Sequence, residues 1–266
     1  MLKNNFQKKL FQAFESRIPQ SFFAFGTLSM AKVYGENWII KSPFMTLKGY
    51  GQHRLNGGKY SNGLFARLDR LSRHYGYGVE WKISKNDLVV DIGANIGEFS
   101  LFCLRKGARV LSVEPDPVIL KCTKKNVSKY KRSVGVEESV VSNSDGCVEF
   151  YQAPSSADSS IIKPDSYDQK LSLNSITLDS LYEKYDLRMV HLVKCDAEGA
   201  EPEVFANASK ALAKTKVVTV NCGPERYGQD TVSEVSDILR NHGFDIEVID
   251  GYKPKTVVVG KNRAFQ

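Results

Sequence analysis

Long apolar runs are missing from this 266-residue sequence, and none approaches the ~18 residues that cross a membrane as a helix. The first residues, Met1 to Phe6, lack the apolar core of a secretion signal. The five cysteines include no C-x-x-C pair, which argues against a disulfide framework and against a zinc site. We therefore expect a cytoplasmic protein whose cysteines are small buried residues or free thiols.

The charged residues leave a modest excess of positive charge. The chain carries a net charge of +7 and is 42% hydrophobic and 25% charged, as an ordinary soluble globular protein is. The excess permits an acidic partner, such as nucleic acid or an anionic membrane face. Much of it lies between Lys121 and Arg132, where Tyr130 is the only aromatic residue. This pattern favours a solvated helix face over a nucleic-acid interface.

The stretch from Leu88 to Ser100 is the most informative part of the sequence. It begins as an apolar run, as a strand buried on both faces does, and continues into a small-residue loop from Gly93 to Gly97. A helical apolar period follows the loop. Strand, glycine loop and helix together can hold a nucleotide-like ligand, because glycine allows close approach and the helix N-terminus offers free N–H groups.

An acid follows this loop at the distance expected for a ribose ligand. Residues 109–113 resemble a second strand that ends at Glu114, and 114 − 93 = 21 residues separate the acid from Gly93, close to the ~20 of a doubly wound fold. The middle glycine that a pyrophosphate requires is missing, because Asn95 occupies its place. The loop therefore argues against NAD and favours an adenosine ligand without a diphosphate, S-adenosylmethionine above all.

Strand-like and helix-like segments alternate from about residue 76 onward. The strand candidates are 88–92, 109–113, 134–142, 189–195, 216–221, 244–248 and 255–260. The helix candidates are 97–106, 117–130, 177–186, 200–213 and 230–242. This alternation predicts an α/β fold with a doubly wound parallel sheet that helices cover on both faces.

Two short connections refine this prediction. Asp145-Gly146 is a tight-turn signal and predicts a hairpin after the third strand. Residues 250–254 are too few for a crossover helix, so the last strand runs antiparallel to its neighbour. A reversed last strand fits a methyltransferase better than a dehydrogenase.

The residues before this alternation are interpreted as an extension. We divide the chain into an N-terminal extension, 1–75, and a methyltransferase domain, 76–266. Residues 1–18 repeat an apolar residue every four positions, which predicts an amphipathic helix. Packing on the domain or on a partner subunit is favoured over peripheral contact with a membrane.

The rest of the extension combines short β-like runs, glycines and a helix. The β-like runs are 30–34 and 38–40, and helical spacing returns at 65–75. The glycine-rich passage between Gly49 and Gly63 is either a substrate-facing loop or a linker. A second polar stretch, 153–172, is either a lid or a flexible surface loop.

The fourth predicted strand of the domain ends in a run of charged residues, Lys194 to Glu201. Ligands of open α/β sheets bind beyond the carboxyl ends of the strands, where Asp91, Glu114 and Asp196 would gather. Alternation places Lys194 and Asp196 on one face of the strand and Cys195 on the other. A helix N-terminus accounts for the acids of the following turn but not for Lys194 and Asp196, to which we assign a catalytic or ligand-positioning role.

Four motifs together resemble the FkbM family of S-adenosylmethionine-dependent methyltransferases. They are Asp91 to Gly97, Val113 to Pro117, Leu178 to Leu181 and Lys194 to Glu201, and the resemblance extends over about residues 77–225. It implies a class I methyltransferase (Rossmann-like) fold and O-methylation, often of sugars, glycans or natural products. The chain departs from the family at Asn221, where an acid is common.

The resemblance also implies a cofactor site. Its residues are Glu80, Asp91, Gly93, Ala94, Asn95, Gly97, Glu114, Pro115, Ser142, Asn143 and Asp196. Gly93 to Gly97 hold the methionine part, Glu114 binds the ribose hydroxyls, Ser142 and Asn143 flank the adenine, and Asp196 lies near the methyl donor.

A base must remove the proton of the acceptor hydroxyl. Asp196, Lys194 and Glu198 are the candidates, although a lysine needs a pKa lowered by burial to serve. His191 is interpreted as a core histidine, and His53 is a weaker candidate base. Asp196 and Asn221 lie at the ends of adjacent predicted strands and can supply two oxygen ligands to Mg²⁺, but two ligands are too few for us to predict a metal site.

We therefore expect a methyltransferase that acts on a hydroxyl of a sugar, a glycan or a small metabolite. One alternative is an RNA methyltransferase of the same fold, which the positive charge motivates. The other is a non-catalytic adenosine-binding or scaffold protein. The acceptor, the general base and the oligomeric state stay open at this level.

Overall fold

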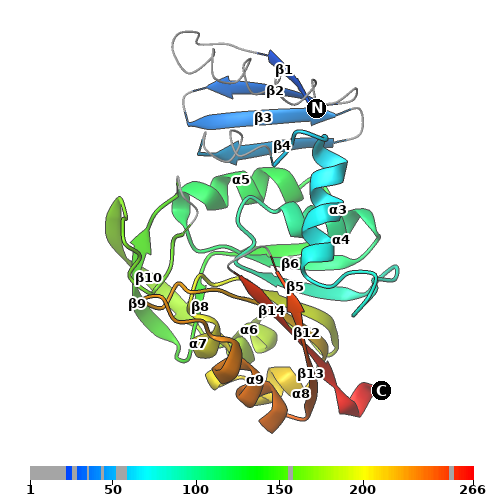
Figure 1. Cartoon of the computed structure of the whole chain (residues 1–266), viewed down its shortest axis with the longest axis vertical. Coiled ribbons are helices and arrows are strands. Elements are labelled where there is room, and N and C mark those ends of the chain that lie inside the picture. The colour runs from blue at the N-terminus through cyan, green and yellow to red at the C-terminus, as the bar shows by residue number, and fades with distance from the viewer. Residues whose placement is uncertain are drawn as a thin grey trace.

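The computed structural model describes most of the chain, and Figure 1 shows how its elements are arranged. The described residues are 22–25, 29–34, 36–42, 45–51, 59–154, 158–251 and 255–266. The predicted amphipathic helix over 1–18 and His53 lie outside them.

A seven-stranded sheet forms the centre of the molecule, in the order β13-β14-β12-β11-β5-β6-β7. Its strands are β5 (Leu88–Ile92), β6 (Arg109–Val113), β7 (Ser133–Glu137), β11 (Val190–Cys195), β12 (Thr215–Cys222), β13 (Phe244–Asp250) and β14 (Thr256–Asn262). The neighbours from β12 to β7 pair in parallel, whereas β14 is antiparallel to both β12 and β13. The predicted reversal of the last strand is thus confirmed.

Helices cover both faces of this sheet, so its strands are apolar on both sides. The helices α3 (Leu64–His74), α4 (Glu98–Arg105) and α5 (Pro117–Val127) share one core with Val89 and Leu192. The helices α6 (Leu178–Lys184), α7 (Glu201–Ala206), α8 (Ser209–Ala213) and α9 (Val232–Asn241) share the other core with Val90 and Val193. Adjacent strand residues therefore enter opposite cores, as the pleat requires.

A smaller antiparallel sheet precedes the domain. Its strands, in spatial order, are β1 (Phe22–Phe25), β2 (Ser29–Tyr34), β3 (Asn37–Ser42) and β4 (Met45–Tyr50). Trp38 and Leu47 are fully buried in the core that α4 and α5 also enter, and Asn126 of α5 exchanges hydrogen bonds with the backbone of Lys48. The sheet lies beside α5 in Figure 1. The boundary at residue 75 stays a prediction.

The predicted hairpin at Asp145-Gly146 is wrong. The strand β8 (Val140–Val141) and the strand β9 (Gly146–Gln152) do not pair, because β10 (Gln169–Ile176) lies between them. β9 and β10 form an antiparallel ladder of seven residue pairs, whereas β8 offers β10 only two. The chain does reverse at Asp145-Gly146, as the turn signal predicts. The longer ladder between β9 and β10 determines that β9 pairs with β10 and not with β8.

Two predicted elements are each divided in the structure. The strand expected over 134–142 is interrupted after Glu137, whose carboxylate accepts hydrogen bonds from the backbone N–H groups of Glu138 and Ser139. The helix expected over 200–213 consists of α7 and α8, with Asn207 and Ala208 between them. Among the described residues, no helix has both the length and the apolar character to cross a membrane.

Candidate active site

A pocket opens at the carboxyl edge of the sheet, where β5, β6 and β11 end. It is lined by Ile92, Gly93, Asn95, Val113, Glu114, Pro115, Asp116, Ile119, Val140, Val141, Phe150, Ser159, Ser160, Ile161, Asp196, Ala197, Glu198 and Ala200. The structure thus brings Gly93, Asn95, Glu114 and Asp196 together, as the parallel order of their strands predicts.

Gly93 is required by the close approach of two loops. A Cβ atom on this residue would lie 1.9 Å from the backbone oxygen of Asp196, and its φ of +67° is one that favours glycine. Asn95 follows at a φ of 53°, which asparagine tolerates better than most residues. The loop after β5 therefore lies directly against the loop after β11.

Glu114 lies at the end of β6 with both carboxylate oxygens facing backbone donors. The N–H of Asn95 donates to its Oε2 atom at 2.7 Å, and the N–H of Asp116 donates to its Oε1 atom at 2.9 Å. Burial raises the pKa of Glu114 to about 7 despite these hydrogen bonds. Each oxygen keeps a further lone pair with which to accept a hydroxyl.

One end of the pocket is apolar, and its lining does not include the two residues predicted to flank an adenine. Val140, Val141 and Phe150 line it, whereas Ser142 and Asn143 do not. Ser142 is buried and its N–H donates to Ile176, and Asn143 is exposed. The division of the predicted third strand places its apolar end, rather than the polar residues after it, against the pocket.

Glu80, Ala94 and Gly97 also lie outside the pocket lining. The carboxylate of Glu80 pairs with Lys261 of β14 at 2.7 Å. Gly97 precedes α4 at a φ of +86°, so it shapes the loop instead of facing the pocket. Pro115 does line the pocket, as predicted.

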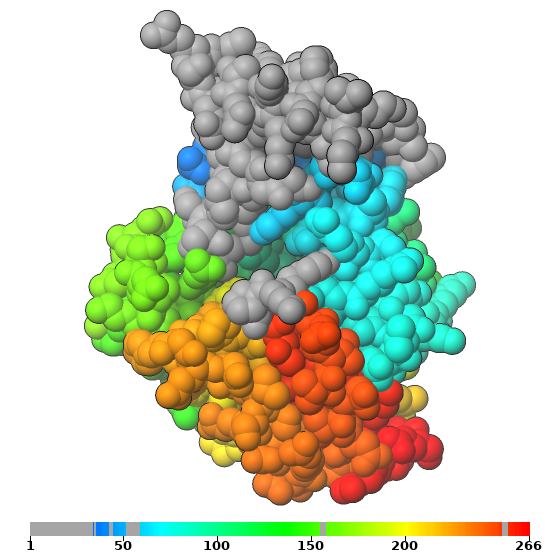
Figure 2. All heavy atoms as spheres, in the orientation of Figure 1, coloured from blue at the N-terminus to red at the C-terminus, as the bar shows by residue number. Residues whose placement is uncertain are grey.

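The segment that joins β9 to β10 spans the pocket. The hydroxyl of Ser159 donates to Asp116 Oδ2 at 2.7 Å, on the Glu114 side. The hydroxyl of Ser160 donates to the backbone oxygen of Ala197 at 3.1 Å, on the β11 side. β9 and β10 project at the side of the molecule (Figures 1 and 2). Ser159 and Ser160 thus contact both walls of the pocket, and the lid interpretation of the segment stays a prediction.

Asp196 accepts hydrogen bonds from two other elements. The hydroxyl of Tyr75, after α3, donates to Oδ2 at 2.7 Å, and the amide of Asn221, in β12, donates to Oδ1 at 2.9 Å. Burial alone would raise the pKa of Asp196, but Lys255, Lys194 and these hydrogen bonds hold it well below its usual range. Asp196 is therefore an oriented, ionised carboxylate.

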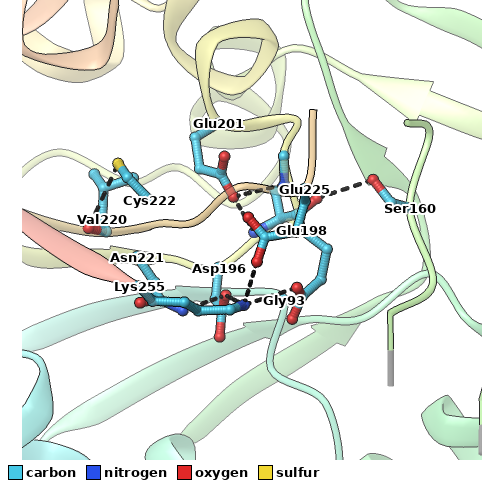
Figure 3. A network of polar contacts seen from close by, with 12 residues as sticks. Gly93, Ser160, Asp196, Glu198, Glu201, Val220, Asn221, Cys222, Glu225 and Lys255 are labelled. Atoms are coloured by element: carbon cyan, nitrogen blue, oxygen red, sulfur yellow. Dashed lines mark hydrogen bonds and ion pairs between the residues drawn. The ribbon is translucent and has the colours of Figure 1, made fainter. Parts of the chain in front are cut away.

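Glu198 has the opposite electrostatic character. Burial and the nearby charge of Asp196 raise the pKa of Glu198 to about 8, although Lys255 donates to its Oε2 atom at 2.8 Å. Its φ of 49° is unusual for a residue other than glycine. Figure 3 shows Glu198 and Asp196 on the same side of the turn after β11, with Lys255 beside them. The pair thus combines a permanent carboxylate with one that titrates near neutral pH.

Lys194 does not have the lowered pKa that a base requires. Its ammonium lies 3.2 Å from Asp91 Oδ1 and donates to the backbone oxygens of Ile92 and Gly93. Burial would lower the pKa of Lys194, but the carboxylates of Asp91 and Asp196 raise it above its usual value. The side chain is a charged anchor beneath the loop after β5.

Glu201 holds the turn that carries Asp196 and Glu198. Its Oε1 atom accepts the N–H groups of Ala197 at 3.0 Å and Gly199 at 3.1 Å, and its Oε2 atom accepts the hydroxyl of Thr231. Burial raises the pKa of Glu201 to about 7. The acid that helix-dipole reasoning explains thus also shapes the site.

Sequence reasoning missed several residues of the site. Tyr75 and Lys255 reach the Asp196–Glu198 pair from segments outside the motifs, and Glu225 contacts Lys255. Of these residues, only Glu225 could have been found from the sequence, because it lies four residues after Asn221, near the carboxyl end of a predicted strand.

His191, which was interpreted as a core histidine, does not reach the acid pair. His191 bonds the backbone oxygen of Lys82 and lies on the amino side of β11, away from the pocket. Another histidine, His74, is buried and 3.1 Å from Asn221 Oδ1, and burial lowers its pKa.

The magnesium hypothesis gains no further ligand from the described residues. Within them, no group of three or more histidine, cysteine or acidic side chains is arranged to hold a metal ion. Asn221 directs its amide nitrogen toward Asp196 and its oxygen toward His74.

The sheet order with its reversed last strand, and a buried acid beside a glycine loop, are those of a class I methyltransferase fold. The methyltransferase FkbM domain model matches residues 91–246. The chain belongs to this FkbM methyltransferase family.

Curated relatives are similar at low identity. The hexuronic acid methyltransferase AglP of Haloferax volcanii is 25% identical over 179 residues, which are 67% of this chain and 72% of AglP. The 2-O-methyltransferase NoeI of Sinorhizobium fredii is 26% identical over 57% of this chain and 70% of NoeI. The 31-O-demethyl-FK506 methyltransferase FkbM of Streptomyces tacrolimicus is 26% identical over 64% of this chain and 76% of its own length.

Among solved structures, the magnesium protoporphyrin IX methyltransferase of Synechocystis with bound S-adenosylmethionine aligns with a TM-score of 0.43 at 12% identity. The alignment covers 75% of this chain and 77% of that chain.

Proposed function

We propose that the protein transfers a methyl group from S-adenosylmethionine to a hydroxyl of a sugar, a glycan or a small metabolite. The observation that carries this proposal is the pair of Asp196 and Glu198 beside the Glu114 pocket, one ionised and one titrating near neutral pH. The names of the relatives support the proposal, since two of them specify O-methylation and one a hexuronic acid.

The pocket residues fit this cofactor. Glu114 would bind the ribose hydroxyls, Val140, Val141 and Phe150 the adenine, and the loop after Gly93 the methionine part. Gly93 supports this fit. A side chain at this position would displace the Asp196 backbone, which faces the pocket. When bound, S-adenosylmethionine supplies a methyl group on a sulfonium, which an acceptor oxygen can attack.

The acid pair divides the remaining chemistry. Asp196 stays ionised at all physiological pH values and can accept a hydrogen bond that orients the acceptor hydroxyl. Glu198 accepts the proton that this hydroxyl loses as its oxygen forms the new bond to carbon and the carbon–sulfur bond breaks. A lysine at position 194 with a raised pKa cannot take that proton, so its role is to hold the loops.

The test is calorimetry with S-adenosylhomocysteine, with NAD as a parallel control. A ligand at ~100 times its dissociation constant stabilises a folded protein by about 2.7 kcal/mol. We expect a heat signal and a rise in unfolding temperature with S-adenosylhomocysteine alone. A response to NAD alone would overturn the cofactor assignment.

The acceptor is then sought by mass spectrometry with neutral glycosides, hexuronides and short RNAs. A mass increase of one methyl group on a sugar hydroxyl supports the proposal. Methylation of RNA alone would select the RNA methyltransferase instead.

A further inference from the structure

Lys255 lies at the centre of the acid cluster on the acceptor side of the pocket. It directly precedes β14, and its ammonium is 2.8 Å from Glu198 Oε2, 2.8 Å from Glu225 Oε1 and 3.7 Å from Asp196 Oδ1. Figure 3 shows it reaching this cluster from the opposite side to the Glu201 carboxylate. The three acids come from the turn after β11 and the segment after β12, so Lys255 joins otherwise separate parts of the site.

The contacts of Lys255 leave one donor underused. An ammonium has three N–H groups. Glu198 and Glu225 take two of them at 2.8 Å each. Within the part of the chain that the structure describes, the nearest further acceptor for the third is Asp196 Oδ1 at 3.7 Å, which is too long for a hydrogen bond. A hydroxyl oxygen beside these two atoms can bridge them, since it can accept from the ammonium and donate to the carboxylate.

The cluster is partly open. About 24% of the Lys255 side chain, 22% of Asp196 and 18% of Glu198 are accessible to solvent, and Asp196 and Glu198 also line the pocket. A ligand can therefore touch all three groups without any rearrangement of the core.

The charges around Lys255 also select the acceptor. Asp196, Glu198 and Glu225 face the ammonium. Further groups act on this cluster from α3, β11 and the turns: Tyr75, His74, Lys194, Glu201 and Arg226. Because the acids around Lys255 outnumber the ammonium, a negatively charged acceptor group would be repelled there.

We propose that Lys255 and Asp196 form the subsite that binds the reacting oxygen of the acceptor, and that this oxygen belongs to an uncharged hydroxyl and not to a carboxylate. The inference rests on the proposed function, which it deepens. The ammonium stabilises the negative charge that grows on the oxygen, and Glu198, which Lys255 contacts, lies within reach of the departing proton.

The first arm of the test concerns the cofactor alone. S-adenosylhomocysteine is titrated into the wild type, Lys255→Met, Lys255→Arg and the control Lys261→Met, in which a lysine of β14 that pairs with Glu80 is lost. All four proteins should bind it within about threefold of one another, because Lys255 lies on the acceptor side. If the wild type does not bind, the proposed function fails whatever the role of Lys255.

The second arm uses crystals of the S-adenosylhomocysteine complex soaked with methyl α-D-glucopyranoside or with its glucuronide counterpart. We expect a hydroxyl oxygen of the neutral glycoside within hydrogen-bond distance of Lys255 and Asp196, in the wild type and in Lys261→Met. Lys255→Met should leave the subsite empty, and Lys255→Arg should restore it in part.

Three outcomes overturn the inference while leaving the cofactor assignment intact. One is a neutral glycoside that binds elsewhere, or not at all, in the wild type. Another is unchanged glycoside binding in Lys255→Met, which would indicate an adventitious additive only. The third is a glucuronide whose carboxylate occupies the subsite.

Discussion

In the proposed site, the cofactor side of the pocket comes from two consecutive strand–loop units, whereas the acceptor side is assembled from four segments that are distant in the chain. On the cofactor side, Gly93 and Glu114 follow β5 and β6, and Glu114 is held by backbone N–H groups of the same loops. On the acceptor side, Tyr75, Asn221 and Lys255 converge on Asp196. The comparison teaches that a cofactor shared by many enzymes can be held by local structure, while the chemistry at the acceptor depends on tertiary contacts.

The largest effect is expected when Glu198, the titrating acid of the acceptor side, is removed. Glu198→Gln should lower kcat by about 10²- to 10⁴-fold and leave S-adenosylhomocysteine affinity within a few-fold, because only the proton acceptor is lost. In the wild type, kcat should rise with pH through about 8, as the Glu198 carboxylate becomes ionised.

The control for this change is Glu203→Gln, since Glu203 pairs with Arg226 and does not line the pocket. The measurement is initial rates of S-adenosylhomocysteine formation from pH 6 to 10. An unchanged pH profile in Glu198→Gln would move the base to another residue.

The contact between the two sides is tested by Gly93→Ala. The new Cβ would meet the Asp196 backbone at 1.9 Å, and the positive φ adds strain. We expect a loss of about 2 to 5 kcal/mol in the free energy of unfolding, with loss of cofactor binding. Gly243→Ala is the matched control, because Gly243 has a φ of +85° but nothing within 4 Å of the added atom. The measurement is unfolding by denaturant. An equal loss in the free energy of unfolding in both variants would contradict the predicted clash with the Asp196 backbone.

The support of the acceptor side predicts a pH-dependent stability. Burial raises the pKa of Glu201 from 4.5 to about 7 in the folded protein. The raised pKa of Glu201 therefore stabilises the folded protein fully below about pH 4.5, and this stabilisation is lost as the pH rises through 7. Its size is about 1.4 kcal/mol for each unit by which the pKa is raised. Glu201→Gln should reduce the loss of stability over this pH range, to which Glu114 and Glu198 also contribute, and the exposed Glu183→Gln should not change it. The measurement is the free energy of unfolding by denaturant at several pH values from 4 to 8. The same pH dependence in Glu201→Gln and in the wild type would contradict the prediction.

The cofactor side is tested by Glu114→Gln against Glu80→Gln. Loss of the Glu114 charge should weaken S-adenosylhomocysteine binding about 10- to 100-fold, since hydrogen bonds to a charged group contribute about 1.5 to 3 kcal/mol. In the wild type, affinity should rise with pH through about 7, where Glu114 ionises. Glu80 pairs with Lys261 outside the pocket, so its change should leave affinity unaltered. The measurement is calorimetry. A larger loss of affinity in Glu80→Gln than in Glu114→Gln would support the cofactor role that the resemblance implies for Glu80 and contradict the role proposed for Glu114.

The smallest effect is expected at the segment that links both sides. Ser159→Ala removes the hydrogen bond to Asp116 and should speed S-adenosylhomocysteine dissociation about fivefold, equivalent to ~1 kcal/mol. Ser166→Ala, an exposed position in the same connection, is the control. Stopped-flow dissociation that is equally fast in both variants would assign the segment to the surface and not to a lid.

The strands and helices of the domain were largely predictable from pattern alone. The apolar runs at β5 and β6 match their predicted bounds, because strands buried on both faces have little else in their sequence. Prediction failed where pairing was decided at long range. Val140 and Val141 join β10 and line the pocket, whereas local turn chemistry favoured a hairpin with the next strand.

The amino-acid sequence by itself determined the α/β alternation, the reversed last strand and the cofactor loop. Each of these is recorded along the chain itself: in the apolar period, in a glycine at a positive φ, and in the 21-residue spacing of Gly93 and Glu114. Only the tertiary structure decided that Lys255 meets Glu198 and Asp196, and that the pKa values of these two acids move in opposite directions. Burial and charge at short distance create that difference, and neither is present until the strands are brought together.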